Sequence, residues 1–344
     1  MVRLRVPYEK IVCISLLSIL GFSAPSFASD SVQQAPTVNQ AQKMSPEQEL
    51  AYRAQNKNET IENRADALRQ LARFPNQNSL VAVARGLKDP NPVIREAAIT
   101  GSELYKLSHR WRMISPLLSD SEMSVRLAAG INLMREYRSM TAEQQVQMEP
   151  VYKELVDTLT SQNRQDTQLQ LADIYRWHGE WTKADVIYQK LVKSEPENAE
   201  VWLNLSDNFR GQNQDEQALV TLNQGIKQLP KEPSLFYSKA LTQVRLNQKE
   251  DAAKSIQTAA TLADNNSYYW YLNGVLQESI DVKLATESFE KAYLISGSPE
   301  QLYAVCDIYV RYGNEKTDAC LEELAKVAPE YVIEQLKRNV SNNN

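Results

Sequence analysis

The sequence predicts an all-α protein built as a right-handed helical-repeat solenoid. Two observations carry this prediction. The chain has only 10 glycines in 344 residues, which favours helices joined by short loops. Small residues also recur every 34 residues, the period of a helix-turn-helix unit that buries its apolar face only against neighbouring units. The recurring residues form two series, Ala172, Ser206 and Ala240, and Ala184, Ala218 and Ala252.

The N-terminus has the pattern of an export signal. Three basic residues precede an apolar run at 11–22, and a small-x-small cleavage site ends at Ala28. We expect a signal peptide over residues 1–28, cleavage after Ala28 and a periplasmic mature protein without membrane insertion. A transmembrane anchor is the competing interpretation, but the run is short of the roughly 20 apolar residues that span a bilayer.

Removal of the signal peptide leaves 35 Lys and Arg against 42 Asp and Glu, a net charge of −7. This acidic balance argues against nucleic acid as a partner. Residues 29–44 are polar and rich in Gln, Ser, Pro and Asn, and they are expected to form a flexible linker. Ser45, Pro46 and Glu47 then have the pattern of a helix start.

A second period of 31 residues relates Arg64, Arg95 and Arg126, with acids at Asp89 and Asp120 between the later copies. Residues 45–140 therefore resemble HEAT repeats, in which an Asp between helices and an Arg on the inner helix form a ladder between units. The resemblance assigns the acids to Asp89 and Asp120 and the bases to Arg95 and Arg126. Apolar spacing over residues 141–164 then predicts a bridging helix, or two short ones.

Residues 165–328 resemble tetratricopeptide (TPR) repeats. In the first unit the resemblance rests on Leu171, Ala172, Tyr175, Gly179, Trp181, Ala184, Tyr188 and Pro196. Later units keep the small and aromatic positions, the fifth only in degenerate form, and residues 329–344 are expected to form a C-terminal capping helix and tail. The whole chain is also loosely similar to the HEAT and TPR tail of some exported multihaem cytochromes.

The TPR resemblance implies a concave groove lined by fixed positions of each first helix. The main positions are Asp173, Arg176, Trp177, Asn204, Asp207, Arg210, Tyr237, Arg245, Tyr271, Tyr303 and Arg311. Tyr, Trp and Arg are typical of binding hot spots. Because Asp173 and Asp207 stand where carboxylate-binding relatives have Asn, a polar, extended protein segment is the expected ligand. Alternatively, Tyr237 and Tyr271 pack across neighbouring helices.

Cys306 and Cys320 are the only cysteines of the expected mature chain. In the repeat alignment they occupy the facing small positions of the fifth unit, if its turn is two residues longer than in the other units. This implies a disulfide in an oxidising compartment, worth about 3 kcal/mol in the chain-entropy model. Two buried free thiols are the alternative, and a redox-active pair is less favoured because CxxC spacing is absent.

No residue pattern predicts catalysis, a cofactor or a metal. The sequence has no haem-attachment motif, phosphate-binding loop or nucleophile elbow, and His109 and His178 have no partner at metal-ligand spacing. The expected function is therefore a non-catalytic protein-protein interaction scaffold or assembly factor. The alternatives are an accessory that docks a multihaem cytochrome or other respiratory protein, and a regulatory partner of a cell-wall or polysaccharide enzyme.

Overall fold

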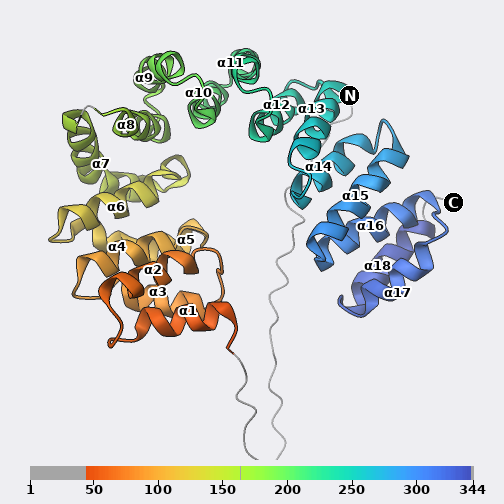
Figure 1. The fold of residues 1–344 in the computed structure, drawn as a ribbon, viewed down its shortest axis with the longest axis horizontal. Helices are drawn as coiled ribbons and strands as arrows, with labels where there is room; N and C mark the ends of the chain where they lie inside the picture. Colours follow the sequence, from red (N-terminus) through yellow and green to blue (C-terminus); the bar gives the residue numbers. More distant parts are fainter. Residues whose placement is uncertain (1–43, 163, 342–344) are drawn as a thin grey trace, which may run out of the picture. The chain divides into compact units, whose positions relative to one another are not determined.

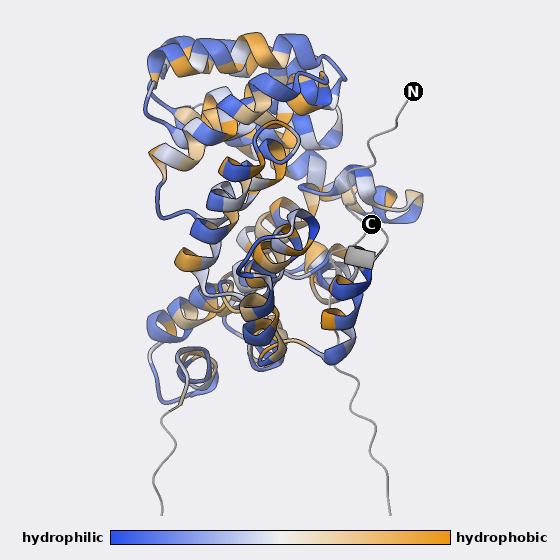
Figure 2. Ribbon diagram, turned by 90° about the vertical axis from the view of Figure 1, so that its right-hand side faces the viewer, coloured by the Kyte–Doolittle hydropathy of each residue, from blue (hydrophilic) through white to orange (hydrophobic). Residues whose placement is uncertain are grey.

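The computed structural model describes residues 44–162 and 164–341, and within these ranges the chain forms helices and no strands (Figure 1). The expected signal peptide and nearly all of the linker lie outside the described residues. None of the described helices combines the length and the apolar character needed to cross a membrane. Figure 2 shows polar and apolar residues interspersed along the helices, as expected for helices that bury one side.

The N-terminal helices are α1 (Pro46–Gln55), α2 (Ile61–Leu71), α3 (Gln77–Gly86), α4 (Pro92–Gly101), α5 (Leu107–Ile114) and α6 (Met123–Met134), with the short 3₁₀ helices η1 (Ser115–Ser119) and η2 (Tyr137–Ser139). Helix α1 begins at Pro46, after Ser45, as the sequence predicted. The Ser45 N–H donates to Oε1 of Gln48 at 3.0 Å, which satisfies a backbone donor at the helix start. Helices α2, α4 and α6 pack successively on one another, and α1 packs on α2 and α3.

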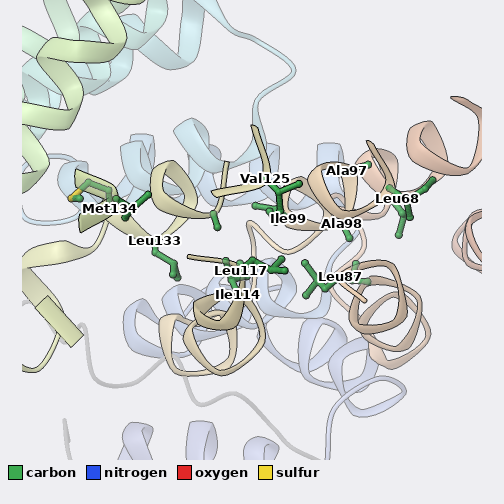
Figure 3. Packing of buried hydrophobic residues seen from close by; sticks show 14 of the residues in the cluster. Leu68, Leu87, Ala97, Ala98, Ile99, Ile114, Leu117, Val125, Leu133 and Met134 are labelled. Carbon is green, nitrogen blue, oxygen red and sulfur yellow. The ribbon is translucent and has the colours of Figure 1, made fainter. Parts of the chain in front are cut away.

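Aliphatic side chains from α2 to α6 interdigitate in the N-terminal core (Figure 3). Leu68, Ile94 and Leu133 are fully buried there. Gly101 permits the close approach of α4 to α2, because a Cβ at this position would lie 2.6 Å from the Leu68 carbonyl oxygen. The sheer closeness of the two backbones explains why the end of α4 carries glycine.

Three ion pairs connect successive helical units of the N-terminal part. Each joins an arginine to a carboxylate 25 to 28 residues later: Arg64 to Asp89 at 2.6 Å, Arg95 to Asp120 at 2.7 Å, and Arg126 to Glu154 at 2.6 Å. The first two pairs use the acids that the sequence assigned to the ladder. The third acid belongs to the next helix, so the ladder continues beyond the 31-residue repeat.

The remaining helices are α7 (Ala142–Gln162), α8 (Gln165–His178), α9 (Trp181–Ser194), α10 (Ala199–Gly211), α11 (Asp215–Gln228), α12 (Pro233–Arg245), α13 (Lys249–Leu262), α14 (Ser267–Gln277), α15 (Val282–Ser296), α16 (Pro299–Tyr312), α17 (Thr317–Ala325) and α18 (Glu330–Ser341). The expected bridging segment is one helix, α7, which contains Pro150 and packs on α6 and α8. From α8 to α17 the helices form consecutive antiparallel pairs, and α18 packs on α16 and α17.

The small residues that defined the 34-residue period are the close contact points of these pairs. Both series are fully buried with 0% of their surface exposed: Ala172, Ser206, Ala240, Ala184, Ala218 and Ala252. Cys306 takes the corresponding position in α16 and is equally buried. Small side chains at these positions let paired helices approach closely, which is the physical basis of the period.

Candidate protein-binding surface

The predicted groove residues all lie on the first helices of the pairs, and α8, α10 and α12 contact one another in sequence. Helix α8 carries Asp173, Arg176 and Trp177; α10 carries Asn204, Asp207 and Arg210; α12 carries Tyr237 and Arg245; α14 carries Tyr271; and α16 carries Tyr303 and Arg311. The repeat therefore places these residues on one row of helices. Their contacts decide which of them are available to a partner.

Asp173 is the centre of a polar network between the first two repeats. Its Oδ1 accepts hydrogen bonds from the Tyr188 hydroxyl at 2.5 Å and from Arg176 at 3.1 Å, and its Oδ2 accepts one from Asn204 at 3.3 Å. Burial raises the pKa of the Asp173 carboxyl, although Arg176 and Tyr188 oppose this effect. Because Asp173 already joins α8, α9 and α10, its main role is to position these helices.

Arg176 and Arg210 are also held by neighbouring side chains. The Arg176 Nε donates to the Tyr188 hydroxyl at 3.0 Å, and its Nη1 lies 3.9 Å from Asp207. Burial acts to lower the pKa of Arg176, but Tyr188, Asp173 and Asp207 outweigh it and raise the pKa. Arg210 donates to Asp207 as well. Both guanidinium groups are therefore oriented before any ligand arrives.

Trp177 lies at the contact between the N-terminal helices and the first TPR-like pair. The guanidinium groups of Arg135, the C-cap residue of α6, and of Arg176 each lie 5.7 Å from the indole centroid, a cation–π distance. The Arg135 side chain is half exposed, and its nearest carboxylate, Glu103, is 3.9 Å away. Trp177 and Arg135 are therefore accessible parts of the surface.

A pocket of about 810 Å³ opens beside Trp177. Its walls come from the end of α6, from α8, and from the α9–α10 turn with the start of α10. Its lining comprises Ile131, Arg135, Gln165, Asp166, Thr167, Leu169, Gln170, Asp173, Trp177, Glu195, Asn198 and Glu200. Of the groove positions of the first unit, Asp173, Trp177 and the apolar Leu169 line this pocket. The sequence missed the contributions of α6 and the α9–α10 turn, because they come from outside the first-helix positions of the repeat.

In the third and fourth repeats the predicted tyrosines pack on other aromatic rings. Tyr237 stacks on Tyr269 with 5.1 Å between ring centroids and meets the edge of Tyr268 at 6.2 Å. Tyr271 meets Phe289 edge-on at 5.6 Å. These contacts favour the packing interpretation for both tyrosines, while Tyr268 remains about half exposed.

The remaining predicted arginines are paired across repeats. Arg245 donates to both carboxylate oxygens of Asp215, at 2.6 and 3.1 Å. Arg311 bonds Glu278 and also donates to Asp307 at 2.8 Å. Burial nevertheless raises the pKa of Asp307 to about 6 and lowers the pKa of Arg311. Asp307 is thus the carboxyl of this surface whose charge is most sensitive to pH near neutrality.

A cluster around His178 joins α7, α8 and the start of α9. The imidazole stacks on Tyr152 at 3.8 Å, its Nε2 lies 3.1 Å from Glu149, and its Nδ1 lies 3.5 Å from Glu180. The Tyr137 hydroxyl donates to Glu149 at 2.9 Å, and burial together with that carboxylate raises the pKa of Tyr137 to about 12. His178 is therefore a packing residue, and its partners could not be predicted from motif spacing in the sequence.

His109, on α5, is exposed, and the described residues contain no group of His, Cys, Asp and Glu that could hold a metal ion. Cys306 and Cys320 form a disulfide between α16 and α17, with 5.5 Å between their Cα atoms. Cys306 is fully buried and Cys320 is 8% exposed. The bridge closes the last helix pair of the array.

Comparison with known proteins identifies the repeat type. Residues 166–198 match the model of the tetratricopeptide repeat. No curated protein matches the sequence.

Solved structures similar to part of the chain include MamA, with 18% identity over 50% of this chain and 97% of MamA at a TM-score of 0.39. MamA of Desulfovibrio magneticus RS-1 has 13% identity over 51% of this chain and 96% of its own, at 0.40. YrrB, described as a TPR protein with an unusual peptide-binding site, has 17% identity over 53% and 97% of the two chains, at 0.42. Residues 166–198 are therefore a tetratricopeptide repeat, and they belong to a series of helix pairs that continues through the described residues.

Proposed function

We propose that this protein is a non-catalytic protein-protein interaction scaffold or assembly factor of the periplasm, which binds a segment of another protein along the first helices of its TPR-like pairs. The observation that carries the proposal is the open pocket beside Trp177, on a repeat type whose stacked units form extended binding surfaces. Apolar, aromatic and charged side chains line the same hollow, a combination that suits a peptide better than a small apolar ligand.

The electrostatics around the pocket support docking rather than turnover. Asp173, Arg176 and Asp207 are engaged with one another and with Tyr188, so their charges are used to hold helices together. Because these side chains are already ordered, less conformational entropy is lost when a segment binds to this surface.

Two features support export. The N-terminal pattern resembles a cleaved signal peptide, and the Cys306–Cys320 disulfide suits an oxidising compartment. Cell fractionation followed by intact-mass measurement tests this part of the proposal. We expect the protein in the periplasmic fraction, beginning at Ser29 and without reactive thiols; a full-length chain retained in the cytoplasm would contradict it.

The binding function is tested by affinity purification with three forms of the protein. The surface variant combines Trp177→Ala with Arg210→Ala, and the control combines Val186→Ala with Val220→Ala, two exposed positions on the second helices α9 and α11. Circular dichroism and urea unfolding first establish that all three are folded. We expect a protein that is retained by the wild type and the control and lost by the surface variant. The same bound proteins on all three forms would place the binding surface elsewhere.

A further inference from the structure

We propose that the pocket beside Trp177 recognises a basic residue, Lys or Arg, next to an apolar residue in the bound protein segment. This inference rests on the proposed binding function and names the chemistry of its partner. Three apolar residues, Ile131, Leu169 and Trp177, offer a surface for the apolar side chain. Two carboxylates would bind the cation: Glu195, in the turn between α9 and α10, and Glu200, in the first turn of α10.

The charge balance of the pocket favours a cation. Four carboxylates line it, against the single guanidinium of Arg135. Two of the four already form ion pairs within the protein, Asp166 with Arg164 and Asp173 with Arg176. Glu195 and Glu200 form no ion pair with any described residue. The uncompensated charge of the pocket is therefore negative and is concentrated on one turn.

Glu195 gives an independent indication that a donor is missing. Its Oε2 accepts a hydrogen bond from Asn198 at 2.9 Å, whereas its Oε1 is buried and has no hydrogen-bond partner among the described residues. Leaving a buried carboxylate oxygen without a donor is unfavourable, so such atoms in native structures call for a partner. If the Glu195 side chain turns this oxygen into the pocket, the ammonium of a lysine or the guanidinium of an arginine supplies the missing donor.

The positive charge of the pocket comes from a different element than its unpaired carboxylates. Arg135 is the C-cap residue of α6, and its guanidinium lies over Trp177, whereas Glu195 lies in the α9–α10 turn and Glu200 in the first turn of α10. A second hollow of about 620 Å³ shares Glu195 and Glu200 and adds Glu197, which is exposed. A segment that passes the turn therefore meets carboxylates on both sides, and a basic residue is favoured there over an acidic one.

Glu200 also has a structural role, which the test must distinguish from a role in binding the cation. It lies in the first turn of α10, where a carboxylate interacts favourably with the helix dipole. Glu216 in α11 and Glu250 in α13 occupy equivalent first-turn positions on second helices and are exposed. A control that neutralises Glu216 and Glu250 removes the same number of charges and at least as much helix-dipole stabilisation, away from the pocket.

The test uses the full chain, expressed and purified as the cell processes it, and a displayed library of random 12-residue peptides. Selection is carried out in parallel on the wild type, on Glu195→Gln/Glu200→Gln and on Glu216→Gln/Glu250→Gln. We expect the wild type and the control to enrich peptides with Lys or Arg beside an apolar residue. The pocket variant should bind these peptides about tenfold more weakly, and high salt should weaken wild-type binding.

The outcomes separate the inference from the binding function. If the enriched peptides are acidic or neutral, or if they bind the pocket variant as tightly as the wild type, the inferred chemistry is wrong. If such peptides are nevertheless lost with Trp177→Ala/Arg210→Ala, the binding function stands without the inferred chemistry. If no form enriches any peptide, the proposed binding function fails as well.

Discussion

Replacing Cys306 and Cys320 together by alanine should destabilise the C-terminal end of the array. Alanine is the residue that the first and third TPR-like repeats have at the position of Cys306, so helix packing is largely preserved and the variant mainly removes the covalent link. The cysteines are 14 residues apart, and a closed loop of about 15 residues is worth about 3 kcal/mol in the chain-entropy model.

The effect should be local, because each repeat contacts only its neighbours. Hydrogen exchange followed by mass spectrometry should show lower protection in α16, α17 and α18 and little change in α8 to α11. Wild-type protein treated with a reductant is the matched control, and it should reproduce the variant. A loss of less than about 1 kcal/mol in urea unfolding, or labelling of two free thiols in the denatured wild type, would refute the role of the bridge as a staple.

Three further variants test the ladder, a close helix contact and a titrating carboxyl. Asp120→Asn leaves the charge of the mostly buried Arg95 without its carboxylate and should lower the free energy of unfolding by about 3 kcal/mol or more. Adding Arg95→Met should partly restore the stability. If the single and the double variant are equally stable, the argument is wrong. Gly274→Ala places a Cβ 2.8 Å from the Phe289 ring and should lower the stability by about 1 kcal/mol, although alanine has the better helix propensity. An unchanged or higher Tm would show that the ring moves aside freely. Asp307 has a pKa of about 6 in the folded protein against an ordinary value of 3.8, so the folded state binds more protons than the unfolded state. Stability should therefore fall by at most about 3 kcal/mol as the pH rises from about 4 to 6. Asp307→Asn should remove this part of the pH dependence, and identical stability profiles of variant and wild type would contradict the argument.

The periodic parts of the sequence predicted the structure best. The 34-residue spacing identified the helix pairs and the buried small positions, since a side chain repeated at the same place in each unit meets the same neighbours. Ser206 and Ala240 are fully buried for this reason. The resemblance to HEAT repeats assigned Asp89 and Asp120 to the ladder, and both residues follow the 31-residue period.

Contacts made once, without repetition, were out of reach of this reasoning. Arg126 pairs with Glu154 on α7, a helix that belongs to neither repeat period. His178 contacts Glu149 and Tyr152, also on α7, where the two kinds of repeat adjoin. The groove positions showed a similar limit. Periodicity indicated which helix carries Asp173, but the bonds that occupy its carboxylate depend on side chains from three different helices.

The Arg–carboxylate ladder has a consequence for how the chain acquires its fold. Each of its pairs spans at most 28 residues, so no pair waits for a distant part of the chain to arrive. Proteins dominated by such short-range contacts fold rapidly, and in repeat arrays structure can begin in one unit and spread to the next. Because the third pair reaches into α7, which packs on α8, structure formed in the N-terminal part can spread through α7 to the first TPR-like pair.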